Sequence, residues 1–183
     1  KEARQCSALA GDEVDRILIE LMLRKGGFDR NNPDDMRTLR AARLTARELK
    51  KDIFRHGKCT MRVGRKQITV LAKELAEDPN FRTYQQALAQ TIAASLRVVA
   101  QRAQAAGGAH IAVVLAGGGS HLPFLTALVQ HAGNSVAQGI QLRIGPLSPA
   151  NPLYTSIDSS LREVFPQIAM AVGGALVEMM PAR

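Results

Sequence analysis

The chain has 183 residues, of which 46% are hydrophobic and 22% are charged, with a formal net charge of +8. This composition excludes a disordered chain and is sufficient for the core of one ordinary domain or two small lobes. Aromatic residues make up 4% of the chain and tryptophan is missing, which disfavours an aromatic platform for single-stranded nucleic acid.

Two helices are predicted at the start of the chain. Gly11-Asp12-Glu13 places acids in the first turn of the first helix, and Gly26-Gly27 ends it. Asn32-Pro33 starts the second helix, with an N-cap followed by proline at the first helical position. This helix should end near His56-Gly57.

A hairpin and a long helix follow. Residues 59–63 and 67–71 have the composition of two short strands around a glycine-containing turn. A break is expected at Asp78-Pro79-Asn80. An alanine-rich helix is then predicted over residues 83–106, ended by two glycines.

The last part of the chain predicts an α/β arrangement. Residues 111–116 are a continuous apolar run, typical of a parallel strand buried on both faces. A glycine turn follows, then a helix over 122–132 and a possible strand over 139–145. A loop with three prolines leads to a final helix over 166–180. Because these strands are few, we expect part of the sheet to lie outside this sequence.

The positive charge is concentrated between residues 37 and 66. This segment has eleven lysines and arginines against Glu48 and Asp52, so it carries +9 and the rest of the chain about −1. Such a run is commonly a solvated helix face. It also suits an acidic protein or nucleic acid electrostatically, but no nucleic-acid-binding motif accompanies it, so nucleic acid is not the expected partner.

Cysteine usage and hydropathy favour a cytoplasmic protein. Cys6 and Cys59 have no metal-like spacing and are too few for a disulfide scaffold. No signal peptide opens the chain, and the apolar stretch 168–180 is too short to span a bilayer, so no membrane partner is expected. The first residue, Lys1, fits an excised fragment of a larger protein.

The most informative motif is the turn Gly117-Gly118-Gly119-Ser120, which joins a strand to a helix. Such a turn lets a ligand approach the backbone, and free N–H groups at the helix start favour anions such as phosphate. The alternative is a tight turn that binds nothing. Leu122 excludes a dinucleotide fingerprint and a nucleophile elbow, because both require glycine there, and the missing lysine excludes a Walker loop.

Four stretches resemble the ATPase domain of the seventy-kilodalton heat-shock chaperones, in that family's order. The family's adenosine-side motif, Val-Gly-Gly-Ser-Thr-Arg-Ile-Pro, is similar to residues 115–123. Its Gly-Glu-Asp-Phe-Asp-Asn segment is similar to residues 11–16, and its Glu-Arg-Ala-Lys-Arg-Thr-Leu-Ser helix end to residues 47–54. Its Pro-Asp-Glu-Ala-Val-Ala-Tyr-Gly-Ala-Ala helix is similar to residues 166–175.

The resemblance implies an α/β, actin-like (ribonuclease H-like) ATPase domain, of which this chain covers the second lobe. Residues 1–85 would form its mainly helical outer subdomain, and residues 86–183 the long helix and C-terminal part of its inner subdomain. It implies ATP or ADP as cofactor, with magnesium in the full-length parent. It also implies a nucleotide-exchange or co-chaperone protein on the outer subdomain as a possible partner.

The resemblance also nominates six nucleotide-binding residues. These are Lys50, Lys51, Gly117, Gly118, Gly119 and His121. The two lysines match positions that touch the nucleoside, the glycines match the turn that the nucleotide approaches, and the histidine matches an arginine that stacks on adenine. No catalytic residue and no metal ligand is nominated.

The chain departs from the family pattern at contacts to the nucleoside. Phe54 stands where the family has a serine at the base, Arg47 replaces a glutamate that holds the ribose, and Gln167 replaces an aspartate. His121 lacks the permanent charge of arginine. Stretches like the family's first phosphate loop, catalytic lysine and magnesium-organising acids are missing from the sequence. We therefore expect weak nucleotide binding or none, and no ATP hydrolysis by this chain.

Three hypotheses follow. The first is an adenine-nucleotide-binding lobe of a divergent heat-shock-type chaperone. The second is a non-catalytic interaction module whose basic surface binds an acidic protein or nucleic acid. The third is an unrelated α/β enzyme that uses the glycine turn for a phosphorylated ligand, which a complete sheet within this chain would favour.

Overall fold

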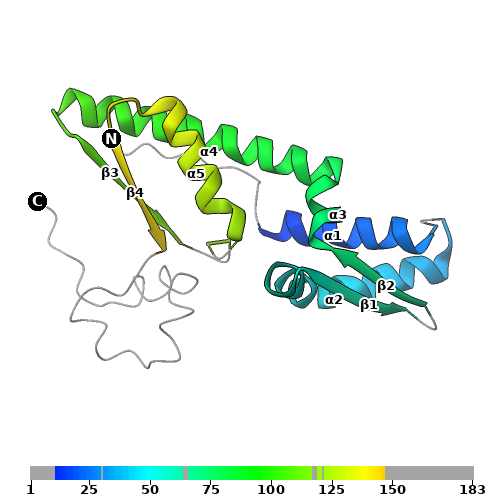
Figure 1. Cartoon of the computed structure of the whole chain (residues 1–183). Coiled ribbons are helices and arrows are strands. Elements are labelled where there is room, and N and C mark those ends of the chain that lie inside the picture. The colour runs from blue at the N-terminus through cyan, green and yellow to red at the C-terminus, as the bar shows by residue number, and fades with distance from the viewer. Residues whose placement is uncertain (1–10, 30, 64–65, 117–118, 121, 147–183) are drawn as a thin grey trace, which may run out of the picture. The chain divides into compact units, whose positions relative to one another are not determined.

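The computed structural model describes residues 11–146 except 30, 64–65, 117–118 and 121. These residues form a mixed α/β arrangement of helices and two small sheets (Figure 1). They divide into two compact units, residues 11–91 and 92–146, and each is described by itself. The expected helix at 166–180 and the proline-rich loop before it lie outside the described residues.

Two helices, α1 (Gly11–Gly26) and α2 (Pro33–His56), pack against each other in the first unit. Gly27 and Gly57 follow them with φ of 68° and 72°, a conformation that glycine adopts without steric cost and that ends a helix. The bounds predicted from the sequence are confirmed for both helices. The buried residues of the two facing surfaces are Val14, Ile17, Leu18, Met22, Ala42, Ala46, Leu49 and Ile53.

The predicted hairpin is confirmed as β1 (Lys58–Val63) paired antiparallel with β2 (Lys66–Leu71). β1 contacts α2, and β2 contacts α1 (Figure 1). Alternation along the strands buries Cys59, Met61, Ile68 and Val70. The opposite face is polar, with the hydroxyls of Thr60 and Thr69 2.9 Å apart. The hairpin therefore has one apolar face toward the helices and one face toward solvent.

A short helix, α3 (Ala72–Glu77), leads from the hairpin into the long helix α4 (Pro79–Ala105). Asp78 lies between them, and its Oδ1 accepts hydrogen bonds from the N–H groups of Asn80 and Phe81 at 2.9 and 3.2 Å. The other carboxylate oxygen pairs with Arg24 of α1. The break expected at 78–80 is thus the cap that starts α4, which begins earlier than predicted. The sequence analysis did not predict α3, although residues 72–77 are strong helix formers.

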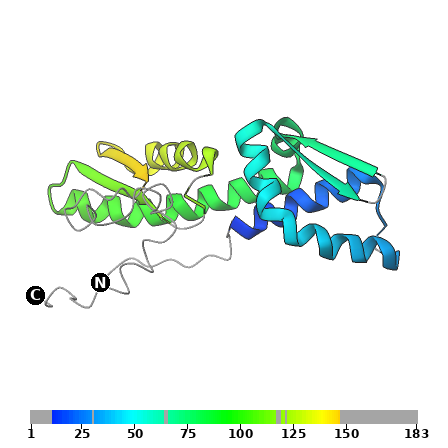
Figure 2. The ribbon, with the colours of Figure 1, turned by 90° about the horizontal axis from the view of Figure 1, so that it is seen from below.

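The second unit is a β–α–β arrangement against the second half of α4 (Figure 2). β3 (His110–Leu115) and β4 (Gln141–Pro146) pair in parallel, and α5 (Pro123–Val136) connects them. The pairing runs from His110 opposite Gln141 to Leu115 opposite Pro146. Its core contains Leu96, Ala100, Ile111, Leu115, Val129 and Ala132. The strands and the helix expected in this part of the sequence are confirmed.

The expectation that residues 111–116 form a strand buried on both faces is wrong. Ile111, Val113 and Leu115 pack in the core with α4 and α5. Val114, on the other face of β3, is 54% exposed. Both helices cover the same face of a two-stranded sheet, so the second face has no layer among the described residues.

Candidate anion site and basic helix face

The glycine turn singled out in the sequence lies at the carboxyl end of β3. β3 ends at Leu115, α5 begins at Pro123, and the parallel pairing with β4 makes the connection a β–α–β crossover. Ligands of open α/β sheets bind outside the carboxyl ends of the strands. The structure describes Gly119 of this turn, whereas Gly117, Gly118 and His121 lie outside the described residues.

The first turn of α5 contains no acidic side chain that would repel an anion. Leu122 is the N-cap, makes no side-chain hydrogen bond to the helix start, and is followed by a first turn without acidic residues. The sequence from Gly107 to Ile157 contains no Asp or Glu. Pro123 has no N–H, and the N–H groups of Leu122 and Leu125 already donate to the carbonyl oxygens of Gly119 and Leu122 at 3.0 Å. The start of α5 would therefore attract phosphate through the positive end of the helix dipole rather than through unpaired N–H groups.

Gly119 is not required by the local backbone. Its φ is not positive, and a Cβ there would lie 3.8 Å from Leu122 Cδ1, an ordinary van der Waals contact. Its carbonyl oxygen accepts a hydrogen bond from the Leu122 N–H at 3.0 Å, which closes the turn before α5. Alanine would therefore fit at this position, and the glycine leaves the backbone open on that side of the turn.

Lys50 is engaged in a contact between α2 and the start of α1. Its Nζ donates to Asp15 Oδ2 and to the carbonyl oxygen of Gly11, both at 3.0 Å, and lies 2.9 Å from Asp15 Oδ1. The sequence analysis missed this pair, although both residues adjoin the apolar stripes of their helices. A charged residue beside such a stripe is the signal that could have indicated an interhelical ion pair.

Lys51 points away from that contact, because successive residues of a helix face different directions. It is exposed and pairs with Glu48 at 2.8 Å, one turn earlier. The hydrogen bond from Lys51 lowers the pKa of Glu48. The structure thus places the two nominated lysines in different surroundings.

Among the residues that depart from the family pattern are Arg47, Phe54 and Gln167. Of these, Arg47 is exposed and Phe54 is half-buried, and Gln167 lies outside the described residues.

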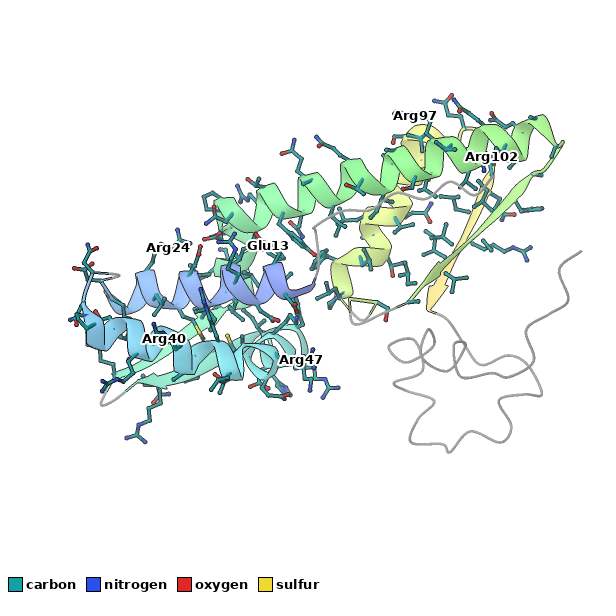
Figure 3. All side chains as sticks on the ribbon, turned by 180° about the vertical axis from the view of Figure 1, so that it is seen from behind. Glu13, Arg24, Arg40, Arg47, Arg97 and Arg102 are labelled. Carbon is teal, nitrogen blue, oxygen red and sulfur yellow. The ribbon has the colours of Figure 1, made fainter. Side chains whose placement is uncertain are left out.

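Five basic residues surround Leu44 on the solvent-facing side of α2. With Leu44 they define the basic face of α2, which comprises Arg37, Arg40, Leu44, Arg47, Lys51 and Arg55. At 3.6 residues per turn, each basic residue lies within about 60° of Leu44 around the helix axis. Leu44 is 87% exposed. Arg40 and Arg47 mark this face in Figure 3. The sequence revealed the charge, but not the leucine at its centre.

Among the residues that the structure describes are a free cysteine, Cys59, and side chains of the types that bind metals. Burial raises the pKa of the Cys59 thiol to about 11, so the thiol is protonated and unreactive at neutral pH. Within the described ranges, no group of three His, Cys, Asp or Glu side chains is placed to hold a metal ion. The helices described here also include none with the length and apolarity needed to cross a membrane.

Comparison of the chain with protein-family models, curated proteins and solved structures found no match. The structure describes three of the six nominated residues, namely Lys50, Lys51 and Gly119. Gly119 belongs to the second unit and the two lysines to the first. Functional proposals therefore rest on the geometry within each unit and on the four resembling stretches.

Proposed function

We propose that this chain is an adenine-nucleotide-binding lobe of a divergent heat-shock-type chaperone, with the fold of the second lobe of an actin-like ATPase. It binds ADP or ATP weakly and does not hydrolyse ATP by itself. The observation that carries the proposal is the glycine turn between the parallel strand β3 and the uncapped start of α5. The cytoplasm is the compartment that this function predicts.

The β3–α5 turn supports the phosphate part of the proposal. Phosphates carry the negative charge of a nucleotide, and the start of α5 offers the positive end of a helix dipole and a first turn without acidic residues. Gly119 leaves the backbone open to a ligand. The preference for an adenine nucleotide over another phosphate compound rests on the similarity of residues 115–123 to the adenosine-side motif.

Lys51 fits a contact to the nucleotide better than Lys50 does. Lys50 would have to give up a half-buried ion pair with Asp15, and an unpaired buried carboxylate is costly. Lys51 is held by the exposed Glu48, a type of pair that contributes little and exchanges readily. We therefore propose Lys51 as the lysine that meets an anionic ligand.

The enzyme hypothesis has less support. A self-contained α/β enzyme would show a larger sheet, whereas β3 and β4 form a two-stranded sheet within the described residues. Phosphoryl transfer also needs a metal, a positioned water and charge stabilisation in one place. The sequence has no stretch that resembles the family elements supplying them. We expect phosphate release from ATP to equal the rate in buffer.

The test is a titration of the isotope-labelled full chain with ADP, without and with magnesium, followed through backbone amide chemical shifts. The proposal predicts shifts at residues 119–125, with a dissociation constant on the order of 1 mM. Gly119→Ala should weaken binding about fivefold or more, because its Cβ would occupy the space through which a ligand approaches the start of α5. Thermal unfolding of this variant should match that of the parent, since the Cβ fits.

Gly145→Ala is the matched control. A Cβ at Gly145 has no neighbour within 4 Å, and the residue lies in β4 rather than in the turn. It should leave ADP affinity unchanged. If millimolar ADP moves no amide of the β3–α5 turn, the proposal is wrong. Equal affinity for inorganic phosphate and ADP would show that the turn binds phosphate without recognising adenine, and would contradict that part of the proposal.

A further inference from the structure

The basic face of α2 has more positive than negative charge, since Glu48, whose pKa is lowered chiefly by Lys51 and also by Arg47 and Arg55, is the acid that accompanies its five basic residues. Glu48 lies close to this face and pairs with Lys51. In the part of the chain that the structure describes, the arginines of this face form no ion pair. Like charges one helical turn apart repel each other and destabilise a helix. The isolated chain therefore keeps this charge at some cost in stability, which carboxylates from a partner would offset.

Leu44 gives this face a second property. It is 87% exposed, above the other large apolar residues that the described chain leaves in solvent. The face extends from Arg37 to Arg55, about 27 Å along the helix at 1.5 Å per residue. Leu44 lies near the middle of this length. A single exposed leucine is ordinary, but here an apolar contact is surrounded by guanidinium groups.

We propose that the basic face of α2 docks an acidic segment of a partner protein. Carboxylates of that segment pair with the arginines, whose planar guanidinium groups bind carboxylates in two-point geometry. An apolar side chain of the segment covers Leu44 and removes it from water. The partner is thus an amphipathic acidic segment with an apolar residue between its acids.

The residues of this face favour a protein over nucleic acid. Leu44 would face phosphate or sugar in a complex with nucleic acid and would gain little there. Arginines can bind phosphates and guanine edges, so the charge alone does not separate the two partners. The face has no aromatic residue on which a base could stack. If the basic face bound nucleic acid only by attracting its phosphates, the exposed position of Leu44 at the centre of the face would have no role.

The basic face shares Lys51 with the proposed nucleotide contact, so docking is tested at other residues of the face. Arg37, Arg40 and Leu44 belong to α2, and the family resemblance nominates none of them for the nucleotide. Substitutions at these three positions therefore test the docking surface alone. ADP-induced amide shifts should be unaffected by them.

The test measures fluorescence anisotropy of a labelled helical peptide of about 20 residues, in which glutamates at i, i+3 and i+4 spacing surround a central leucine. The full-length chain should bind it, more weakly at high salt. Leu44→Gln and the pair Arg37→Gln with Arg40→Gln should each weaken binding about fivefold or more. Replacing the peptide leucine by glutamine should cost a similar factor, and should add nothing in the Leu44→Gln chain.

The matched control removes two charges elsewhere in the same unit. Lys58 and Arg62 are exposed on the outer face of β1, so the pair Lys58→Gln with Arg62→Gln changes the net charge equally. This control should keep peptide affinity within about twofold. An equal loss in the control would mean diffuse charge attraction and overturn the proposal. Tighter binding of a DNA duplex than of the peptide, or no effect of Leu44→Gln, would overturn it as well.

Discussion

The Lys50 ammonium lies 2.9 and 3.0 Å from the two carboxylate oxygens of Asp15, 35 residues earlier in the chain. The side chains are 15% and 16% exposed, so water screens the pair only in part. The same ammonium donates to the carbonyl oxygen of Gly11, which joins the start of α1 to α2. A lysine that the sequence nominates for nucleotide binding thus has a structural partner.

The first prediction concerns this ion pair. Asp15→Ala should lower the free energy of unfolding by about 2 to 3 kcal/mol, because it leaves a mostly buried ammonium without its carboxylate. Urea unfolding followed by circular dichroism measures the change. Asp12→Ala removes the same charge from an exposed position of the same turn and should cost less than about 1 kcal/mol. Equal losses in the two variants would show that the pair contributes nothing specific.

The second prediction concerns packing of α5 on the sheet. A Cβ on Gly133 would lie 1.8 Å from Leu142 Cδ1 and 3.7 Å from Leu96 Cδ1. Gly133→Ala should therefore destabilise the chain by about 1 to 3 kcal/mol, although alanine normally stabilises a helix interior relative to glycine by up to about 1 kcal/mol. Thermal unfolding gives the sign directly. A rise in the unfolding temperature would contradict the close packing of α5 on β4.

The third prediction concerns the start of α4. Asp78→Ala removes the acceptor for two backbone N–H groups and the partner of Arg24, and should cost about 1 to 2 kcal/mol. Asp78→Asn keeps the cap but loses the charge, and should cost less. Arg24→Gln should cost more than Asp78→Asn, because it leaves the Asp78 carboxylate, whose side chain is 1% exposed, without its cationic partner. The order of the three variants in urea unfolding tests whether capping outweighs the ion pair.

The fourth prediction concerns Cys59. Because burial raises its pKa to about 11, its thiolate fraction at pH 8.5 should be below about 1%. Alkylation by iodoacetamide should be slow in a folded Cys6→Ser chain and should accelerate in denaturant. A rate in the folded chain equal to that of a free thiol would contradict the buried position.

The raised pKa of Cys59 makes a contribution to the pH dependence of stability between about pH 9 and 11. The unfolded thiol ionises near its ordinary pKa of 9.0, whereas the folded thiol stays protonated to about 11. Above pH 9 the unfolded state therefore loses its proton first and is favoured, so this contribution to stability falls as pH rises toward 11. A Cys6→Ser, Cys59→Val chain should lack this component of the alkaline decrease.

Local signals in the sequence predict much of the first unit. The Asn32-Pro33 start and the Gly26-Gly27 end act within a few residues, and α1 and α2 have the bounds that these signals indicate. Two strand-like runs around a glycine-containing turn likewise predict the hairpin. Asp78 shows the limit of such reasoning. Pro79, which follows Asp78, suggests a break in the helix. Only the positions of the N–H groups of Asn80 and Phe81 identify Asp78 as the cap that starts α4.

The candidate sites were predictable in part. The glycine turn and the basic segment are visible as residue patterns. The uncapped start of α5 and the exposure of Leu44 are not, because they depend on where neighbouring side chains lie. Ala42 and Ala46 lie on the buried face of α2, and Leu44, midway between them, lies on another face. This helical spacing was the signal in the sequence that could have indicated its exposure.

The sequence by itself determined α1, α2 and α5, the hairpin and the location of the positive charge, because caps, turns and periodicity act over a few residues. Tertiary structure alone decided the parallel pairing of β3 with β4, the open face at Val114 and the partner of Lys50. These features join residues far apart in the chain. Their energies depend on distances and burial that exist only after the helices have packed.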